Sequence, residues 1–215
     1  MIAFGTGGWR AIIGEEFTKE NVSRLALAVA RRMRAEGADE RGIAIGFDRR
    51  FLSREAAKWA AEVMAAEGVR THFIAREAPT PLVMFTVKAM GLDYGMAVTA
   101  SHNPALYNGV KLFTRGGRDA SLEVTEPLGA AASAIGRAEI RAVRYEDAVT
   151  RGLVTEIAPE NRYLDAIIET LDMEKIRGRN LSIVLDPMYG VSRTSLQTIL
   201  LTARCDVDVI HERHD

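Results

Sequence analysis

The segment Ser101-His102-Asn103-Pro104 places a hydroxyl, an imidazole and an amide between two apolar runs of the β type. These groups are therefore expected at the end of a strand, where a rigid sheet presents a loop that can carry chemistry. Pro104 lacks an amide hydrogen and biases Asn103 towards extended geometry, so it should end the first strand. Ser101, His102 and Asn103 become candidate site residues.

Residues Asn108 and Gly109 tolerate positive φ, so we expect them to form a tight return into the second strand. That strand would carry Lys111 back towards Ser101. A hydroxyl and an ammonium group would then lie at one end of the sheet.

A serine hydrolase is the first alternative, because Ser101 and His102 are neighbours. Adjacent side chains of an extended chain point in opposite directions, so His102 is badly placed to act as the base of a catalytic triad. The chain also has no Gly-x-Ser-x-Gly elbow around Ser101. A polar turn without chemistry is the second alternative.

Two other segments hold candidate site residues. Arg10 follows a glycine-rich turn and could offer a planar set of donors to phosphate. Asp48 and Arg50 follow the apolar run 43–47, at the carboxyl end of an expected strand, where α/β proteins often bind ligands. The same two residues could simply belong to a solvated loop.

Alternating helix and strand patterns predict an α/β protein. Helices are expected from Thr18 to a stop at Gly37, from Ser53 as the cap to Gly68, and over residues 82–90, 122–135, 160–171 and 192–203. Strands are expected over residues 43–47, 69–74, 94–99, 109–113, 181–186 and 207–211. Residues 136–158 show no strong period and are expected to be irregular. We therefore expect one domain over residues 1–150 and an incomplete domain of similar type over residues 151–215, each with a strand–helix–strand unit.

Composition limits the classes of partner. Lys and Arg total 28 and Asp and Glu total 29, so the net charge of −1 argues against a surface built for nucleic acid or acidic membranes. The single cysteine, Cys205, forms no internal disulfide, and no apolar run approaches the ~20 residues that span a bilayer. A cytoplasmic protein is expected.

The run Thr-Ala-Ser-His-Asn-Pro, followed by Tyr-Asn-Gly-Val-Lys, resembles the active-site serine loop of the α-D-phosphohexomutases, the phosphoglucomutase and phosphomannomutase family. Phe-Gly-Thr-x-Gly-Trp-Arg near the start and Asp-x-Arg-Phe-Leu-Ser after the strand 43–47 are similar to two further motifs of that family. Pro-Thr-Pro before the serine loop and Asp-Pro-Met-Tyr-Gly at residues 186–190 also fit. Gly7 and Ala11 depart from the usual pattern.

The resemblance implies a three-layer, mixed-sheet domain I and an incomplete domain II. It implies interconversion of hexose 1-phosphate and hexose 6-phosphate through a phosphoserine at Ser101 and a bisphosphorylated sugar. The implied catalytic residues are Ser101, Lys111, Arg10 and His102, with Asn103, Asp48 and Arg50 binding phosphate or supporting the loop. Lys111 would be a general base or a charge stabiliser.

The implied cofactor is Mg²⁺, bound to the phosphate on Ser101, and the implied activator is a hexose 1,6-bisphosphate. The family's Asp-Gly-Asp-x-Asp-Arg metal loop is absent from the sequence, so its ligands are expected in the missing part of domain II. A fragment or truncated homologue with little mutase turnover is therefore expected. The alternative is a non-catalytic module that binds a sugar phosphate or a partner protein. The sequence leaves open which hexose is used and the oligomeric state.

Overall fold

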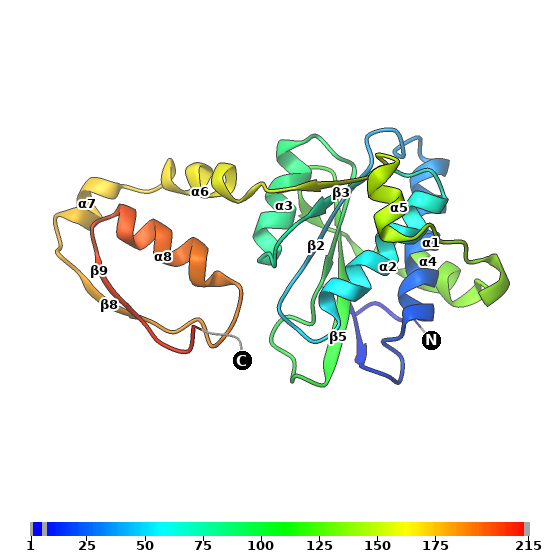
Figure 1. Ribbon diagram of the computed structural model, residues 1–215, viewed down its shortest axis with the longest axis horizontal. Coiled ribbons are helices and arrows are strands. Elements are labelled where there is room, and N and C mark those ends of the chain that lie inside the picture. Colours follow the sequence, from blue (N-terminus) through cyan, green and yellow to red (C-terminus); the bar gives the residue numbers. More distant parts are fainter. Residues whose placement is uncertain (1, 6–7, 213–215) are drawn as a thin grey trace. The chain divides into compact units, whose positions relative to one another are not determined.

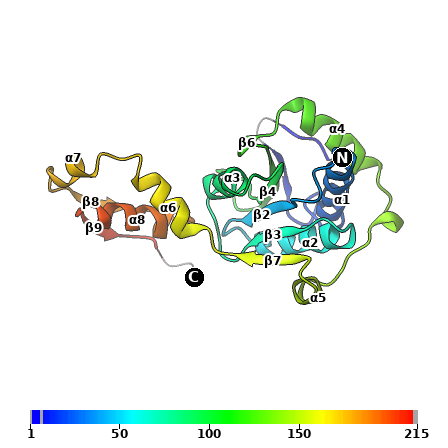
Figure 2. The same ribbon diagram turned by 90° about the horizontal axis from the view of Figure 1, so that it is seen from above.

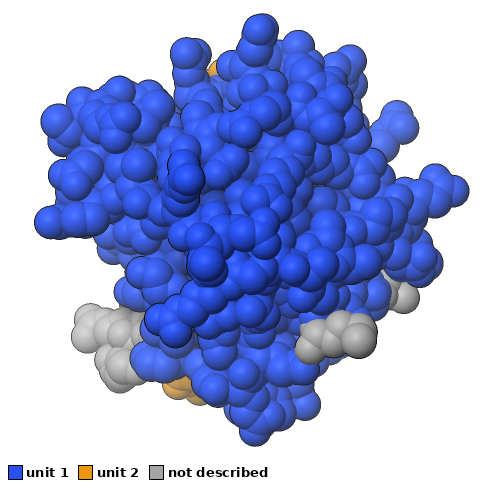
Figure 3. Space-filling view, turned by 90° about the vertical axis from the view of Figure 1, so that its right-hand side faces the viewer, with its two compact units in different colours: residues 1–157 blue, residues 158–215 orange. Residues whose placement is uncertain are grey.

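The structure is a computed structural model that describes residues 2–5 and 8–212. Its chain divides into two compact units, residues 1–157 and residues 158–215. Figure 1 follows the chain through both units, and Figure 3 gives each unit its own colour. Each unit is described by itself.

Unit 1 is built on one mixed sheet. Its strands are β1 (Trp9–Ile12), β2 (Ile43–Phe47), β3 (Thr71–Ile74), β4 (Tyr94–Val98), β5 (Tyr107–Thr114), β6 (Arg118–Asp119) and β7 (Val154–Ile157). The order is β1-β5-β4-β2-β3-β7, with β6 paired to β5. Strands β4, β2, β3 and β7 run parallel, whereas β5 is antiparallel to both β4 and β1.

Helices cover both faces of this sheet, which makes three layers (Figures 1 and 2). The helices are α1 (Lys19–Ala35), α2 (Ser53–Ala66), α3 (Thr80–Ala89), α4 (Leu122–Ala134) and α5 (Tyr145–Thr150). Helices α1, α2 and α4 enclose the main core on one face, and α3 lies on the other. The expected three-layer, mixed-sheet fold is confirmed.

Local sequence explains how α1 forms and where it packs. Thr18 caps its first turn by accepting a hydrogen bond from the backbone N–H of Asn21 at 3.2 Å. Its apolar positions recur at helical spacing, and they are buried in the core. Tyr94 ties its last turn to the start of β4: the phenol donates to Glu36 at 2.6 Å and accepts from Arg32 at 3.0 Å. Burial and the bond to Glu36 raise the pKa of Tyr94 to about 12.

Helix α3 packs closely on its face because glycines clear the sheet beneath it. A Cβ at Gly46 would lie 2.5 Å from a methyl of Val83, and one at Gly95 would lie 2.3 Å from a methyl of Val87. Both distances are far below van der Waals contact. The two glycines therefore fix the spacing between α3 and the strands that precede the site loops.

The region 136–158 was expected to be irregular, and that expectation is wrong. It contains a 3₁₀ turn (Arg137–Glu139), α5 and β7. Strand β7 adds to the sheet edge by pairing with β3, with Thr71 opposite Val154. Because β7 belongs to the sheet of unit 1, that unit extends to Ile157, beyond the expected boundary at residue 150.

Unit 2 contains α6 (Glu160–Ile168), α7 (Met173–Arg177), β8 (Ser182–Leu185), α8 (Ser192–Thr202) and β9 (Asp206–Val209). Strands β8 and β9 pair in parallel, and α8 packs against β9 and α6. Asp186, after β8, accepts a hydrogen bond from the N–H of Met188 at 2.8 Å and lies 3.0 Å from His211. The bond with His211 lowers the pKa of Asp186.

The strand–helix–strand segments β2-α2-β3 and β8-α8-β9 have the same order of elements, but their strands pair in different registers. Val207 pairs with Ile183, three residues before Asp186. The corresponding position in unit 1, Ile45, pairs with Phe73.

Across the described residues, no helix is long and apolar enough to cross a membrane.

We predict that Gly109→Ala destabilises unit 1. A Cβ there would lie 2.1 Å from the carbonyl oxygen of Trp9, which cannot move without breaking the pairing of β1 with β5. Such overpacking costs about 1–3 kcal/mol of unfolding free energy. Urea unfolding followed by the fluorescence of Trp9 and Trp59 would measure it, since both tryptophans lie in unit 1.

Gly136→Ala is the matched control, because its Cβ would come no nearer than 3.7 Å to Glu139 and its φ is −77°. Its effect should be close to zero. Equal unfolding free energies for the two alanine variants would contradict the predicted steric conflict.

Candidate active site

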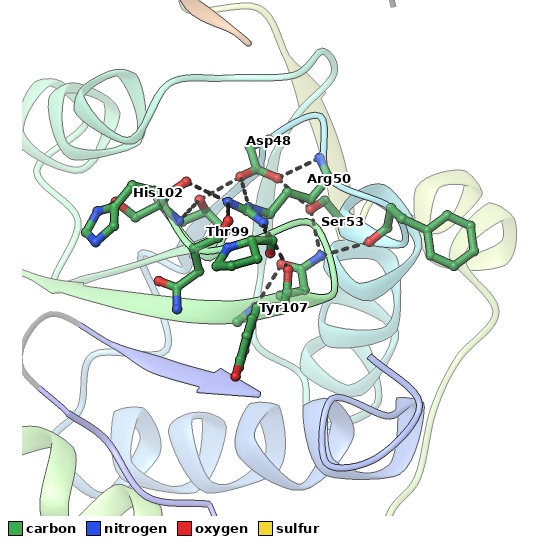
Figure 4. Close-up of polar contacts among 12 residues, drawn as sticks. Asp48, Arg50, Ser53, Thr99, His102 and Tyr107 are labelled. Atoms are coloured by element: carbon green, nitrogen blue, oxygen red, sulfur yellow. Dashed lines mark hydrogen bonds and ion pairs between the residues drawn. The ribbon is translucent and has the colours of Figure 1, made fainter. Parts of the chain in front are cut away.

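The candidate site lies at the carboxyl ends of two adjacent parallel strands. Phe47 at the end of β2 is in register with Val98 at the end of β4, and the N–H of Asp48 donates to the carbonyl of Val98 at 3.1 Å. Asp48 and the loop after β4 are therefore neighbours, although about fifty residues separate them in the chain. Figure 4 shows the polar contacts that join them.

Ser101 has a left-handed backbone with φ of 57°, and its side chain is exposed. Residues other than glycine rarely adopt this conformation, and holding one there costs on the order of 1 kcal/mol or more. Side chains hold both of its backbone polar groups: its N–H donates to Thr99 Oγ1 at 3.0 Å, and its carbonyl accepts from Arg50 Nη2 at 2.7 Å. The nucleophile candidate is thus fixed by contacts to other parts of the chain.

The side chain of Arg50 holds the serine loop through the loop's main-chain carbonyl groups. Its guanidinium donates to four carbonyl oxygens of the loop, at 2.6–3.1 Å, which belong to Ser101, Asn103, Pro104 and Tyr107. A planar fork of donors suits this convergent set of acceptors, and a lysine could not match it. Arg50 also lies 3.5 Å from Asp48. The structure therefore places both expected support residues against the loop.

Asp48 collects hydrogen bonds from several elements. One carboxylate oxygen accepts from the N–H of Arg50 at 2.9 Å and from the hydroxyl of Ser53 at 2.6 Å. The other accepts from the hydroxyl of Thr99 at 2.6 Å. Charge-assisted hydrogen bonds of this kind are stronger than neutral ones, so Asp48 is a rigid junction of β2, α2 and β4.

Ser53 was expected to cap α2, and the structure contradicts this. Leu52 occupies the cap position with a left-handed φ of 63°, and no side chain caps the helix. Ser53 is fully buried as the first helical residue, and its hydroxyl binds Asp48. The Ser53 hydroxyl donates to a carboxylate outside the helix, instead of accepting from a backbone N–H in the first turn of α2.

Asn108 was expected in a tight turn, but it lies inside β5 and is fully buried. Its amide nitrogen donates to Phe51 O and to Ser53 Oγ, both at 2.9 Å, and its amide oxygen accepts from the N–H of Gly109 at 2.8 Å. Sequence reasoning missed Asn108, Ser53 and Thr99 as site residues. The available signal was an asparagine next to an apolar strand run, where buried amides need partners.

His102 is exposed, and its Nδ1 lies 3.4 Å from Ser101 Oγ, at the long limit of a hydrogen bond. Among the described residues, no carboxylate binds the imidazole. A triad needs a base that a third group orients, so this geometry does not favour a serine hydrolase.

Asn103 lies in the turn that follows Ser101. Its N–H donates to Ala100 O at 3.1 Å, and its carbonyl accepts from Arg50 at 2.6 Å. Its side-chain oxygen is buried and has no partner in the part of the chain that the structure describes. Asn103 therefore supports the loop through its backbone and keeps one free acceptor.

Arg10 and Lys111 lie on one face of the sheet. Arg10 is opposite Gly109 in the β1–β5 ladder, and Lys111 is two residues further along β5, on the same side. Gly109 accepts from the N–H of Thr99 at 2.9 Å, so both cations lie on strands next to the serine loop. Lys111 is largely buried and lies 3.9 Å from Asp119.

The described residues do not form a metal site by themselves. No group of three His, Cys, Asp or Glu side chains within residues 2–5 and 8–212 could hold a metal ion. Asp48, the carboxylate bound to the serine loop through Thr99, already accepts three hydrogen bonds and forms an ion pair with Arg50. Mg²⁺ prefers six oxygen ligands, and this donor set does not fit it.

Comparison with known proteins gives the family. Residues 1–139 match the family model described as phosphoglucomutase/phosphomannomutase, alpha/beta/alpha domain I, and residues 161–215 match that of alpha/beta/alpha domain II. The chain belongs to the phosphoglucomutase/phosphomannomutase family. The structure thus holds domain I and part of domain II of this phosphohexomutase family.

Relatives with assigned names are mutases. The phosphoglucosamine/phosphogalactosamine mutase of Sulfurisphaera tokodaii is 29% identical over 99% of this chain and 45% of its own length. The phosphoglucosamine mutase of Mycolicibacterium vanbaalenii is 31% identical over 99% of this chain and 46% of its own length. A Thermus thermophilus structure assigned as a phosphomannomutase matches with a TM-score of 0.82 and 27% identity, covering 97% of this chain and 45% of that one. The chain spans less than half the length of these phosphohexomutase relatives.

We predict that Arg50→Lys loosens the serine loop. Lysine cannot make all four bonds to carbonyl oxygens, and each charge-assisted bond lost costs about 1.5–3 kcal/mol. Chymotrypsin should then cut after the exposed Leu106 at least about tenfold faster than in the parent protein. Arg76→Lys, at an exposed position outside the network, is the control. Equal cleavage rates in Arg50→Lys and Arg76→Lys would refute the role of the guanidinium.

Proposed function

We propose that this chain carries the phosphoryl-accepting part of a phosphohexomutase, an enzyme that interconverts hexose 1-phosphate and hexose 6-phosphate. The supporting observation is Ser101, exposed and held in a left-handed conformation by Arg50 and Thr99 within domain I of this family. A left-handed backbone at an exposed hydroxyl supports this proposal, because contacts from two other segments, through Arg50 and Thr99, offset its cost.

In the proposed reaction, phosphoserine 101 donates its phosphoryl group to a hydroxyl of the sugar. The new bond joins phosphorus to the sugar oxygen, the bond from phosphorus to Ser101 Oγ breaks, and the proton of the sugar hydroxyl passes to the serine oxygen. The second phosphate of the bisphosphorylated sugar then returns to Ser101 in the reverse sense. Catalysis of this step depends on in-line placement and on positive charge around the phosphoryl oxygens.

The surrounding residues would take separate roles. Lys111 would act as a general base or, with Arg10 on the same sheet face beside the loop, would stabilise phosphoryl charge. His102, whose Nδ1 lies 3.4 Å from Ser101 Oγ, would hydrogen-bond or position the phosphate on that oxygen. Asn103 would hold the loop through its backbone, whose N–H donates to Ala100 and whose carbonyl accepts from Arg50.

Mg²⁺ on the phosphate of Ser101 and a hexose 1,6-bisphosphate activator remain parts of the proposal that rest on family likeness. Because the described residues do not form a magnesium site, no step here is assigned to the metal. The same observation supports the alternative function, a non-catalytic module that binds a sugar phosphate or a partner protein. We propose a cytoplasmic location and a hexose phosphate as the small-molecule partner.

Intact mass spectrometry tests the proposed nucleophile. After incubation with glucose 1,6-bisphosphate and Mg²⁺, the protein should gain the mass of one phosphate, because the sugar ester can transfer it to Ser101. Ser101→Ala should gain none, whereas Ser121→Ala, at an exposed serine outside the site, should gain it as the parent does. An unmodified parent protein, or a modified Ser101→Ala, would overturn the assignment.

A steady-state assay separates the mutase from the module. With glucose 1-phosphate and glucose 1,6-bisphosphate, residues 1–215 alone should show little or no turnover, because no described carboxylate cluster is present to hold the metal. Phosphate uptake on Ser101 without turnover is the expected combination. Robust production of glucose 6-phosphate would show that the metal ligands are not needed and that this part of the reasoning is wrong.

A further inference from the structure

A chain of hydrogen bonds runs from Asn108 in β5 to the backbone of Ser101. Asn108 Nδ2 donates to Ser53 Oγ at 2.9 Å, and Ser53 Oγ donates to Asp48 at 2.6 Å. On the other side of the carboxylate, Thr99 Oγ1 donates to Asp48 at 2.6 Å and accepts from the N–H of Ser101 at 3.0 Å. Figure 4 shows these contacts between segments far apart in sequence.

Most of this chain of bonds is closed to water. Asn108 and Ser53 have no exposed surface, and Thr99 is 6% exposed. In such an interior a hydrogen bond is electrostatically stronger than in water, and a group left without a partner is costly. The bonds between these residues therefore cannot be exchanged for bonds to solvent.

The direction of every bond in the chain is fixed. The N–H of Ser101 and the amide nitrogen of Asn108 can only donate. The amide orientation of Asn108 follows from its oxygen, which accepts from the N–H of Gly109. The hydroxyl of Thr99 must therefore accept from the N–H of Ser101, and that of Ser53 must accept from Asn108. Each hydroxyl then donates its single proton to Asp48. The ionised carboxylate accepts from both sides.

We infer that Thr99, Ser53 and Asn108 are positioning residues that, acting through Asp48, hold Ser101 in its left-handed conformation. The φ angle of Ser101 decides where its Oγ lies, so relaxation towards an extended backbone would move the nucleophile. An error of about 1 Å in the position of a reacting group can cost on the order of 100-fold in rate. This catalytic consequence rests on the proposed function, whereas the conformational statement does not.

Amide hydrogen exchange at Ser101, measured by NMR on the full chain, tests the link through Thr99. Thr99→Val keeps the shape but removes the hydroxyl, and exchange of the Ser101 amide should become on the order of tenfold faster. Thr99→Ser restores the hydroxyl and should restore slow exchange. Thr86→Val is the matched control, since Thr86 is a buried threonine whose hydroxyl bonds only within α3. Unchanged exchange in Thr99→Val, or fast exchange in Thr99→Ser, would overturn the inference.

Ser53→Ala tests the remote part of the chain, because Ser53 does not touch Ser101. Exchange at Ser101 should accelerate more than exchange at core amides such as that of Phe73, which report general loss of stability. Acceleration equal at both amides would reduce Ser53 and Asn108 to a structural role and would overturn the inference. If Ser53→Ala does not fold, Asp48→Asn replaces it. The amide NH₂ of asparagine cannot accept a hydrogen bond, so one of the hydroxyls of Ser53 and Thr99 would lose its acceptor. Amide exchange at Ser101 should then accelerate as in Ser53→Ala.

The rate of phosphate uptake links this inference to function. Thr99→Val should take phosphate from glucose 1,6-bisphosphate on the order of 100-fold more slowly than the parent, and Thr99→Ser should recover most of the rate. If the parent protein takes up no phosphate while Thr99→Val still accelerates exchange at Ser101, the proposed function fails and the inference stands. If uptake is normal in the parent and equal in Thr99→Val, and exchange at Ser101 is unchanged in that variant, the inference fails and the proposed function stands.

Discussion

The candidate site depends on one junction, the carboxylate of Asp48. Its two oxygens accept hydrogen bonds from the start of α2, from Thr99 after β4 and from the backbone after β2. A carboxylate with fewer donors in this half-buried place would be costly, and hydroxyls without it would lose their acceptor. The junction and the left-handed serine therefore stabilise each other: the network offsets the strain of the backbone, and the strained backbone completes the network.

The mixed sheet makes this junction possible. Parallel pairing of β2 with β4 brings Asp48 and the serine loop to one edge, because parallel strands end on the same side. Antiparallel pairing of β5 with β4 then returns the chain along the site and buries Asn108 beneath it. The site therefore needs both kinds of pairing: the parallel pairing brings Asp48 and the serine loop to one edge, and the antiparallel pairing returns β5 along the site.

The described residues would supply only part of the chemistry of the proposed phosphohexomutase. They supply the hydroxyl, a loop clamp in Arg50 and two cations in Arg10 and Lys111, all on domain I. They supply no group of carboxylates for a metal ion. Under the proposed function, charge neutralisation from this part of the chain would come from side chains on the sheet.

Local sequence determined those elements whose apolar spacing is strong: the helix at 19–35, the strands at 43–47 and 94–98, and the repeated strand–helix–strand order of unit 2. It also identified the serine loop, because Ser101 to Pro104 is a continuous motif. It missed β7, since an edge strand with two exposed residues lacks a buried period.

The positive φ of Ser101, the bond of Ser53 to Asp48 and the buried amide of Asn108 were decided only by tertiary structure. Ser101 depends on Arg50, 51 residues away, and Asn108 on Ser53, 55 residues away. Asp48 is near Ser53 in the chain, but its carboxylate is oriented by Thr99 as well, from a different strand. Local propensity contains no information about such distant partners. These partners act by burying the residue and by the combined electrostatic effect of several polar groups around it.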